Sequence, residues 1–164
     1  MKIIKALLLL TIVISVSSCS KDNEIPTKIY AITANVDGSA TTFTDVTGTT
    51  GSVNGNILTT MQGKASDGST VSIAINGEIV AGKTYSAATV GASVQPLVSY
   101  SSGGDIYLNN AVGANLVSVT VTEVADNFIE GTFKGDLATV VVGNGAVKTK
   151  IITNGIFTAK LKKQ

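Results

Sequence analysis

Apolar and polar residues alternate along most of the chain after residue 28. Segments 71–76, 117–122 and 157–162 each carry an apolar or small side chain at every second position, with mostly polar residues between them. A period of two indicates strands with one buried and one exposed face, as in antiparallel sheets. Val, Ile and Thr are frequent, and their branched Cβ atoms favour extended backbone. No stretch keeps apolar residues at helical spacing over three turns, so the pattern predicts an all-β protein.

Short pairs of Asp or Asn followed by Gly separate the strand-like segments. Such pairs accept the positive φ angles of tight hairpins. They occur at Asp37-Gly38, Asp67-Gly68, Asn144-Gly145 and Asn154-Gly155. The clearest predicted hairpin joins 148–153 to 156–161 through Asn154-Gly155. Further hairpins are predicted for 29–36 with 41–46, 57–65 with 70–76 and 117–124 with 128–135, with short strands near 97–101 and 105–109.

Residues 28–164 are predicted to form a single domain. A chain of about 140 residues can bury roughly two-thirds of its unfolded surface, which is sufficient for one core. The spacing of turns predicts about eight to ten short strands arranged as an antiparallel β-sandwich or a flattened barrel. The Gly-rich stretch Gly48 to Gly55 lacks the pattern of a phosphate-binding loop and is predicted to be a flexible turn.

The first residues have the organisation of an export signal. Lys2 and Lys5 precede an apolar run at 6–16, and small residues lead to Cys19. The run is too short to span a bilayer. The segment 16–19 resembles the bacterial lipobox, which implies cleavage before Cys19 and acylation of its thiol. We therefore expect a signal peptide at 1–18 and a lipidated tether at 19–27, with the membrane as partner through the lipid on Cys19.

Three motifs resemble an uncharacterised family of small Bacteroidetes lipoproteins. They are Val36-Asp37-Gly38 followed by Phe43, Gly131-Thr132-Phe133, and the segment 152–157. The resemblance implies a domain of unknown function with no catalytic residues to carry over. Lys21 and Asp22, directly after Cys19, resemble the surface-export signal of that phylum. They imply an outer-membrane lipoprotein that faces outward.

Composition excludes several classes of chemistry. The chain has no His, no Arg and no Trp, and its one Cys is Cys19. Hydrolase triads that use His, Cys-His proteases and His-ligated metal sites are therefore excluded. Removal of the signal peptide leaves ten Lys and eleven acids, a net charge near minus one. Such a chain is a poor candidate for nucleic-acid binding. We expect no enzyme activity, cofactor or metal.

Two groups of residues remain as candidates for function. Glu123 and Glu130 flank a predicted turn and could approach each other as a glycosidase pair does, but their positions are typical of exposed surface acids. Tyr85, Tyr100 and Tyr107 could form a flat platform for sugars. The expected function is that of a lipid-anchored, non-catalytic binding or structural module. The alternatives are a glycan-binding accessory of a nutrient-capture system and a lipocalin-like carrier with an apolar cavity.

Overall fold

The computed structural model describes residues 28–87, 96–109, 117–139 and 145–164, and within these ranges its regular secondary structure is all β. This confirms the predicted fold class. Eleven strands are described, one more than the upper end of the predicted range. They are β1 Ala31–Val36, β2 Ser39–Phe43, β3 Thr47–Val53, β4 Asn56–Lys64, β5 Thr70–Asn76, β6 Thr84–Ala87, β7 Leu97–Ser102, β8 Asp105–Leu108, β9 Val117–Ala125, β10 Phe128–Thr139 and β11 Thr149–Lys163.

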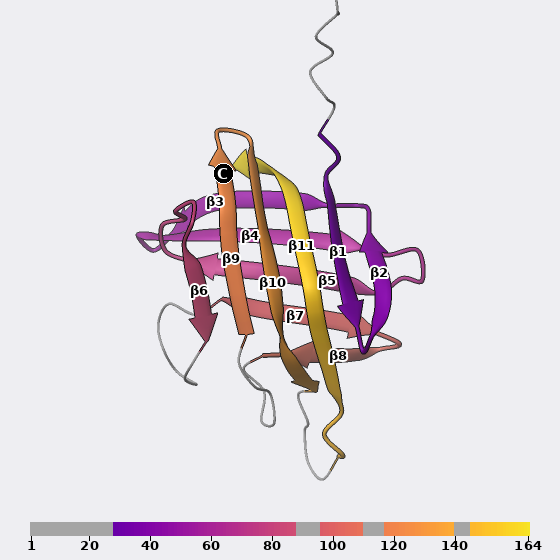
Figure 1. Ribbon diagram of the computed structural model, residues 1–164. Coiled ribbons are helices and arrows are strands. Elements are labelled where there is room, and N and C mark those ends of the chain that lie inside the picture. Colours follow the sequence, from indigo (N-terminus) through magenta and orange to yellow (C-terminus); the bar gives the residue numbers. More distant parts are fainter. Residues whose placement is uncertain (1–27, 88–95, 110–116, 140–144) are drawn as a thin grey trace, which may run out of the picture.

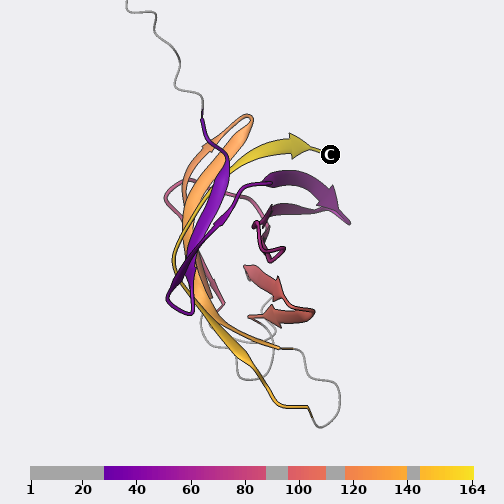
Figure 2. The same ribbon diagram turned by 90° about the vertical axis from the view of Figure 1, so that its right-hand side faces the viewer.

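The strands form two packed layers (Figures 1 and 2). The front layer has the order β2-β1-β11-β10-β9-β6, and the back layer has the order β3-β4-β5-β7-β8. In Figure 1 the strands of the front layer run nearly at right angles to those of the back layer. This is the orthogonal way of packing two sheets, in which long strands pass from one layer to the other at the corners.

Two long strands join the layers. The end of β11 leaves the front layer, and its residues Leu161–Lys163 pair in parallel with β3. At another corner the end of β10 pairs with β8 through Ala138 and Thr139. All eleven strands thus belong to one mixed sheet, folded into an arrangement between a sandwich and a barrel. The predicted sheet was wholly antiparallel, and the β11–β3 pairing is the exception.

The hairpin predicted at Asn154-Gly155 is wrong. β11 runs through both residues as one strand and pairs with β1 on one side and β10 on the other. Asn154 does adopt a positive φ of 51°, but as a β-bulge, and the register of both neighbours shifts there. The bulge changes the phase of alternation, so that Ile152 and Phe157 both face the core. The other predicted hairpins are present as β1–β2, β4–β5 and β9–β10.

The stretch predicted as a flexible turn at Gly48 to Gly55 contains strand β3. Its glycines allow close approach of the end of β11. A Cβ atom on Gly48 would lie 2.7 Å from the carbonyl oxygen of Lys160, and one on Gly51 would lie 3.3 Å from Cβ of Gln164. The true turn is confined to Asn54 and Gly55, both with positive φ. Glycine here permits packing and does not signal flexibility.

The core lies between the layers and is filled by large apolar side chains. The inward faces predicted for 71–76, 117–122 and 157–162 are confirmed, with Leu161 only partly buried. Aromatic rings pack side by side, and the Phe133 and Phe157 centroids are 6.4 Å apart. The largest fully buried side chains are Phe43, Phe157, Ile32, Met61, Ile73, Ile75, Ile129, Leu137, Ile152, Val71, Val98 and Val117.

Two ion pairs hold strand ends together at the lower end of the molecule in Figure 1. Nζ of Lys150 lies 2.6 Å from Asp37, and Nζ of Lys148 lies 2.6 Å from Asp105. Partial burial acts to raise the pKa of Asp37, but hydrogen bonds from Lys150 and the Ile151 backbone N–H, with the Lys150 charge, leave that pKa below its usual value. The hydrogen bond to Asp37 raises the pKa of Lys150. The first pair connects β11 to the β1–β2 turn. The second pair connects the residue just before β11 to β8.

Candidate functional site

A continuous row of mostly threonine side chains crosses all six strands of the front layer. Adjacent members are directly opposite each other in the sheet register, from β6 through β9, β10, β11 and β1 to β2. Each is exposed or half-buried. We call this set the hydroxyl row; its members, in order, are Thr84, Thr120, Thr132, Ile156, Thr33 and Thr42.

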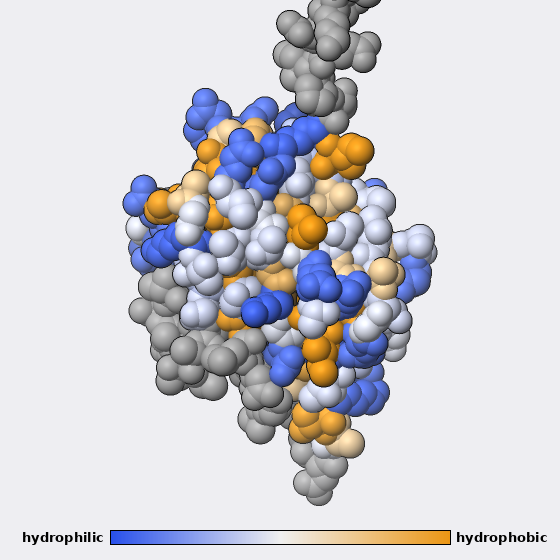
Figure 3. Space-filling model, in the orientation of Figure 1, coloured by the Kyte–Doolittle hydropathy of each residue, from blue (hydrophilic) through white to orange (hydrophobic). Residues whose placement is uncertain are grey.

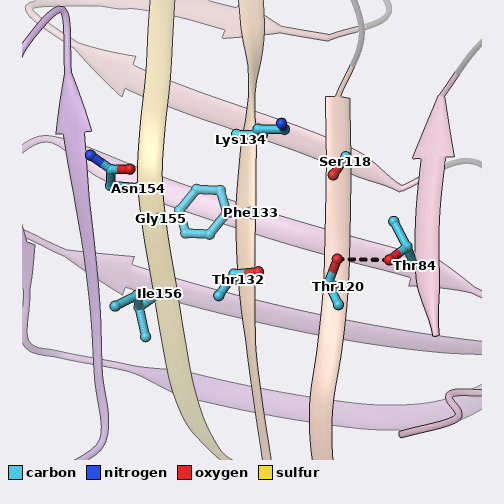
Figure 4. A pocket seen from close by; sticks show the side chains of 9 residues that line it. All are labelled: Thr84, Ser118, Thr120, Thr132, Phe133, Lys134, Asn154, Gly155 and Ile156. Atoms are coloured by element: carbon cyan, nitrogen blue, oxygen red, sulfur yellow. Dashed lines mark hydrogen bonds between the residues drawn. The ribbon is translucent and has the colours of Figure 1, made fainter. Parts of the chain in front are cut away.

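Strand alternation places the hydroxyl row on the outer surface. The neighbours Val119, Phe133 and Phe157 are buried, so the residues beside them along each strand point outward. Strands lie about 4.8 Å apart, so the row extends for about 24 Å. Oγ1 of Thr84 lies 2.8 Å from Oγ1 of Thr120, as Figure 4 shows. The row therefore offers three hydroxyl groups on β6, β9 and β10 and two on β1 and β2, separated by the exposed apolar side chain of Ile156 on β11.

A shallow depression of about 590 Å³ lies over part of the hydroxyl row. Figure 4 shows side chains from β6, β9, β10 and β11 around it. Lys134 is the one charged residue among those that line it. In Figure 3 the centre of this face is mostly pale, the colour of intermediate hydropathy. Its lining consists of Thr84, Ser118, Thr120, Thr132, Phe133, Lys134, Asn154, Gly155 and Ile156.

The bulge in β11 shapes one wall of the depression. Asn154, the residue with positive φ, and Gly155 both line it. A Cβ atom on Gly155 would lie 2.5 Å from the Phe133 ring and from the Phe133 carbonyl oxygen, so Gly155 lets that ring pack against the backbone of β11. The side chain of Asn154 adds an amide donor and acceptor at the edge of the depression, and in Figure 4 it points away from the threonine side chains. The depression can therefore form hydrogen bonds of both kinds with a neutral polar ligand.

The three tyrosines predicted as a platform do not form an exposed patch. Tyr85, Tyr100 and Tyr107 are each 5 to 6% exposed and belong to the core. Tyr100 and Tyr107 are together, with ring centroids 6.0 Å apart across β7 and β8. Tyr85 lies on β6, where its hydroxyl donates to the Glu78 carbonyl oxygen and accepts from the Val80 N–H. Their rings contribute apolar area to the core. The sequence around these tyrosines lacks regular alternation, so it did not reveal that they are buried.

Glu123 and Glu130 do approach each other, as direct partners on β9 and β10. Nζ of Lys28 lies 2.8 Å from Glu130 and 3.7 Å from Glu123. The same ammonium group is 3.1 Å from the centroid of the Phe128 ring. The Glu123 side chain is 55% exposed. The arrangement is a surface ion-pair cluster, which agrees with the prediction of two surface acids.

The residues predicted to carry the lipid and the export signal, Cys19, Lys21 and Asp22, lie outside the described residues. Within the described part of the chain, no helix has the length and apolar character needed to cross a bilayer. The same part of the chain contains no group of three or more His, Cys, Asp or Glu residues placed to hold a metal ion.

The hydroxyl row was not predicted. Its members on β9 and β10 are visible in the sequence as the polar positions of alternating strands, but the lateral order of the strands is not. Alignment of the row depends on pairing between β1 and β11, which are distant in sequence. Comparisons of the chain with protein-family models, with curated proteins and with solved structures return no match.

Proposed function

We propose that this protein is a non-catalytic binding module of the bacterial cell envelope, anchored by lipid on Cys19, which binds its ligand through the outer surface of the front layer. The observation that supports this most directly is the hydroxyl row, which crosses six strands and lies partly under a depression lined by Thr84, Thr120 and Thr132. The lipid anchor is supported by the position of Cys19 after a short apolar run. Lys21 and Asp22 support display on the outer side of the outer membrane.

The chemistry of the surface favours a neutral, hydroxyl-rich ligand. Threonine hydroxyls both donate and accept hydrogen bonds, as sugar hydroxyls do. A polyanion would require several cations, and Lys134 is the one that lines the depression. The row is long and shallow, which suits an extended chain better than a small molecule. A strand of neutral glycan fits these requirements, so the glycan-binding function is proposed here at the hydroxyl row, away from the buried tyrosines.

Packing of the core favours a surface site over a carrier function. A lipocalin-like carrier holds its ligand in a cavity between or within sheets. Here Phe43, Met61 and Phe157 are fully buried between the layers, together with many Ile and Val side chains. This arrangement is typical of a packed sandwich. The ligand is therefore proposed to bind outside the core.

Removal of the hydroxyl groups tests the proposal without changing side-chain shape. Val has nearly the same shape as Thr and the same preference for strands. We expect the triple variant Thr84→Val, Thr120→Val, Thr132→Val to bind neutral glycans at least about tenfold more weakly, because each lost hydrogen bond contributes about 0.5–1.5 kcal/mol. Binding would be measured on a glycan array and by co-sedimentation with insoluble neutral polysaccharides.

A matched control lies on the back layer. Thr49 and Thr60 are half-buried and opposite each other on β3 and β4. The double variant Thr49→Val, Thr60→Val should bind like the wild type. Equal glycan binding by the triple variant and the wild type would exclude the hydroxyl row as the binding surface. Preference for anionic over neutral glycans would contradict the proposed ligand class.

A further inference from the structure

The end of the domain where the described chain begins is the one nearest to the lipid anchor. Lys28 follows Cys19 by nine positions, and a fully extended chain covers only about 30 Å over that distance. A compact domain of this size is about 35–40 Å across. The tether is therefore too short to let the opposite end of the domain face the membrane. The surface around Lys28 lies within about 30 Å of the bilayer.

Three segments meet at this end of the molecule. They are the residues before β1, the turn between β9 and β10, and the end of β11, which Figures 1 and 2 both place together at the top. The backbone N–H of Leu161 donates to the carbonyl oxygen of Asn127 in that turn. Lys28 contacts Phe128, which is the partner of Lys160 in the sheet. We call this surface the tether end; its residues are Lys28, Ile29, Val124, Lys160, Lys162 and Lys163.

Apolar side chains at the tether end are exposed to solvent. Ile29 is 82% exposed, the highest value among the large apolar residues described. Val124 is 39% exposed and lines a groove of about 320 Å³ together with Leu161 and Lys163. Burial of such side chains is favourable. The headgroup region of a bilayer, which the tether brings within reach, can bury them.

Lysines at the two ends of the domain differ in their partners. At the opposite end, Lys148 and Lys150 are each paired with an aspartate. At the tether end, none of Lys160, Lys162 and Lys163 forms an ion pair with a described carboxylate. The acids near this end are Glu123 and Glu130, both held by Lys28, with Asp126 in the β9–β10 turn and Glu78 in the groove.

We propose, on the basis of the proposed acylation of Cys19, that the tether end rests on an anionic lipid surface. Ile29 enters the headgroup region, and Lys160, Lys162 and Lys163 pair with anionic headgroups while their alkyl stems lie along the apolar surface. The long strands of the front layer then stand upright on the membrane (Figure 1). The hydroxyl row faces sideways and remains accessible.

Introduced tryptophans test this orientation because the chain contains none of its own. Full-length acylated protein would be reconstituted into vesicles of phosphatidylethanolamine and phosphatidylglycerol that include lipids with brominated acyl chains. One reporter is Ile29→Trp. The matched control is Ile106→Trp, a residue of β8 that is 57% exposed near the opposite end. We expect several-fold stronger quenching of the Trp at position 29, with a blue-shifted emission.

A second arm tests the lysines. In the Ile29→Trp background, Lys160→Gln with Lys162→Gln and Lys163→Gln should reduce the quenching several-fold in anionic vesicles, and in vesicles of phosphatidylcholine alone the substitutions should have no effect. Equal quenching at both reporter positions, or no effect of the lysine substitutions, would overturn the proposal while leaving the anchor intact. Failure of the protein to float with vesicles at all would instead contradict the acylation of Cys19 and, with it, this orientation.

Discussion

Single polar residues in this protein connect strand ends through hydrogen bonds and ion pairs, and Asp37 is the clearest example. It has a positive φ of 49° in the β1–β2 turn, accepts a hydrogen bond from the Ile151 N–H, and pairs with Lys150. One side chain thus stabilises a turn, a strand contact and an ion pair. The first two roles need only an oxygen acceptor and a residue that tolerates positive φ, whereas the third needs a charge.

Replacement of Asp37 by Asn separates the charge from the other two roles. The lowered pKa of Asp37 means that its ionised form stabilises the fold fully above about pH 4, and that this contribution is lost as the pH falls through the folded-state pKa. Asp37→Asn should lower the free energy of unfolding near pH 7 by at most about 1 kcal/mol, because the pair is partly exposed and screened.

Urea unfolding between pH 7 and pH 2 measures the difference. The wild type should lose more stability than Asp37→Asn on acidification, so that the two proteins become similar in stability at the acid end. Asp105, whose pKa is lowered by the hydrogen bond from Lys148, is present in both proteins and cancels in the comparison. Parallel pH profiles would show that the charge of Asp37 does not contribute.

At the scale of elements, local sequence was sufficient for strands that pair with their neighbours in the chain and insufficient for those that do not. The β1–β2, β4–β5 and β9–β10 hairpins follow from alternation and turn residues. Asn154-Gly155 has the same turn chemistry, yet it lies within β11. A positive φ serves a hairpin and a bulge equally. What decides between them is that β1 and β10 flank β11 on both sides, and this pairing is not local.

The bulge at Asn154 is expected to set the phase of β11. Substitution of Asn154 by Val would disfavour the bulge, because a β-branched residue resists a positive φ. Asn154→Val should lower the free energy of unfolding by about 1–3 kcal/mol, the usual cost of holding a residue in an unfavourable backbone conformation. Chemical denaturation would measure it.

The substitution Asn154→Gly provides the control for Asn154→Val. Glycine accepts a positive φ without strain, so the effect of Asn154→Gly should be small. An Asn154→Val variant as stable as Asn154→Gly would show that the bulge in β11 does not require a residue that tolerates positive φ.

For the molecule as a whole, the sequence allowed prediction of the all-β class but not of the candidate binding surface. The exposed and buried faces of β5, β9 and the end of β11 were predicted correctly. The hydroxyl row requires the order of six strands, which alternation does not contain. The tyrosines were misplaced for a related reason. Burial of Tyr100 and Tyr107 depends on Phe43 packing edge-on against Tyr100 from another strand, 6.5 Å away between centroids.

The proposed lipid anchor concerns the whole molecule and can be tested in cells. Metabolic labelling with a palmitate analogue should mark the wild type, and Cys19→Ala should be unlabelled and released from membranes. Two or three acyl chains anchor a protein stably in a membrane, and the Cys19→Ala protein would carry no acyl chain at this position. Labelling of Cys19→Ala to the level of the wild type would contradict the lipobox assignment.

The position of β11 between β1 and β10 also governs when the protein can fold. β1 is among the first strands to be made, and its main partner is the last strand of the sheet. Until β11 is available, β1 and β2 have no route into the front layer, and β3 lacks the strand that joins it to that layer. Contacts between distant segments form slowly, typically over milliseconds to seconds in all-β domains. For the export proposed above, this topology means that the native sheet cannot close before β11 has crossed the secretion channel.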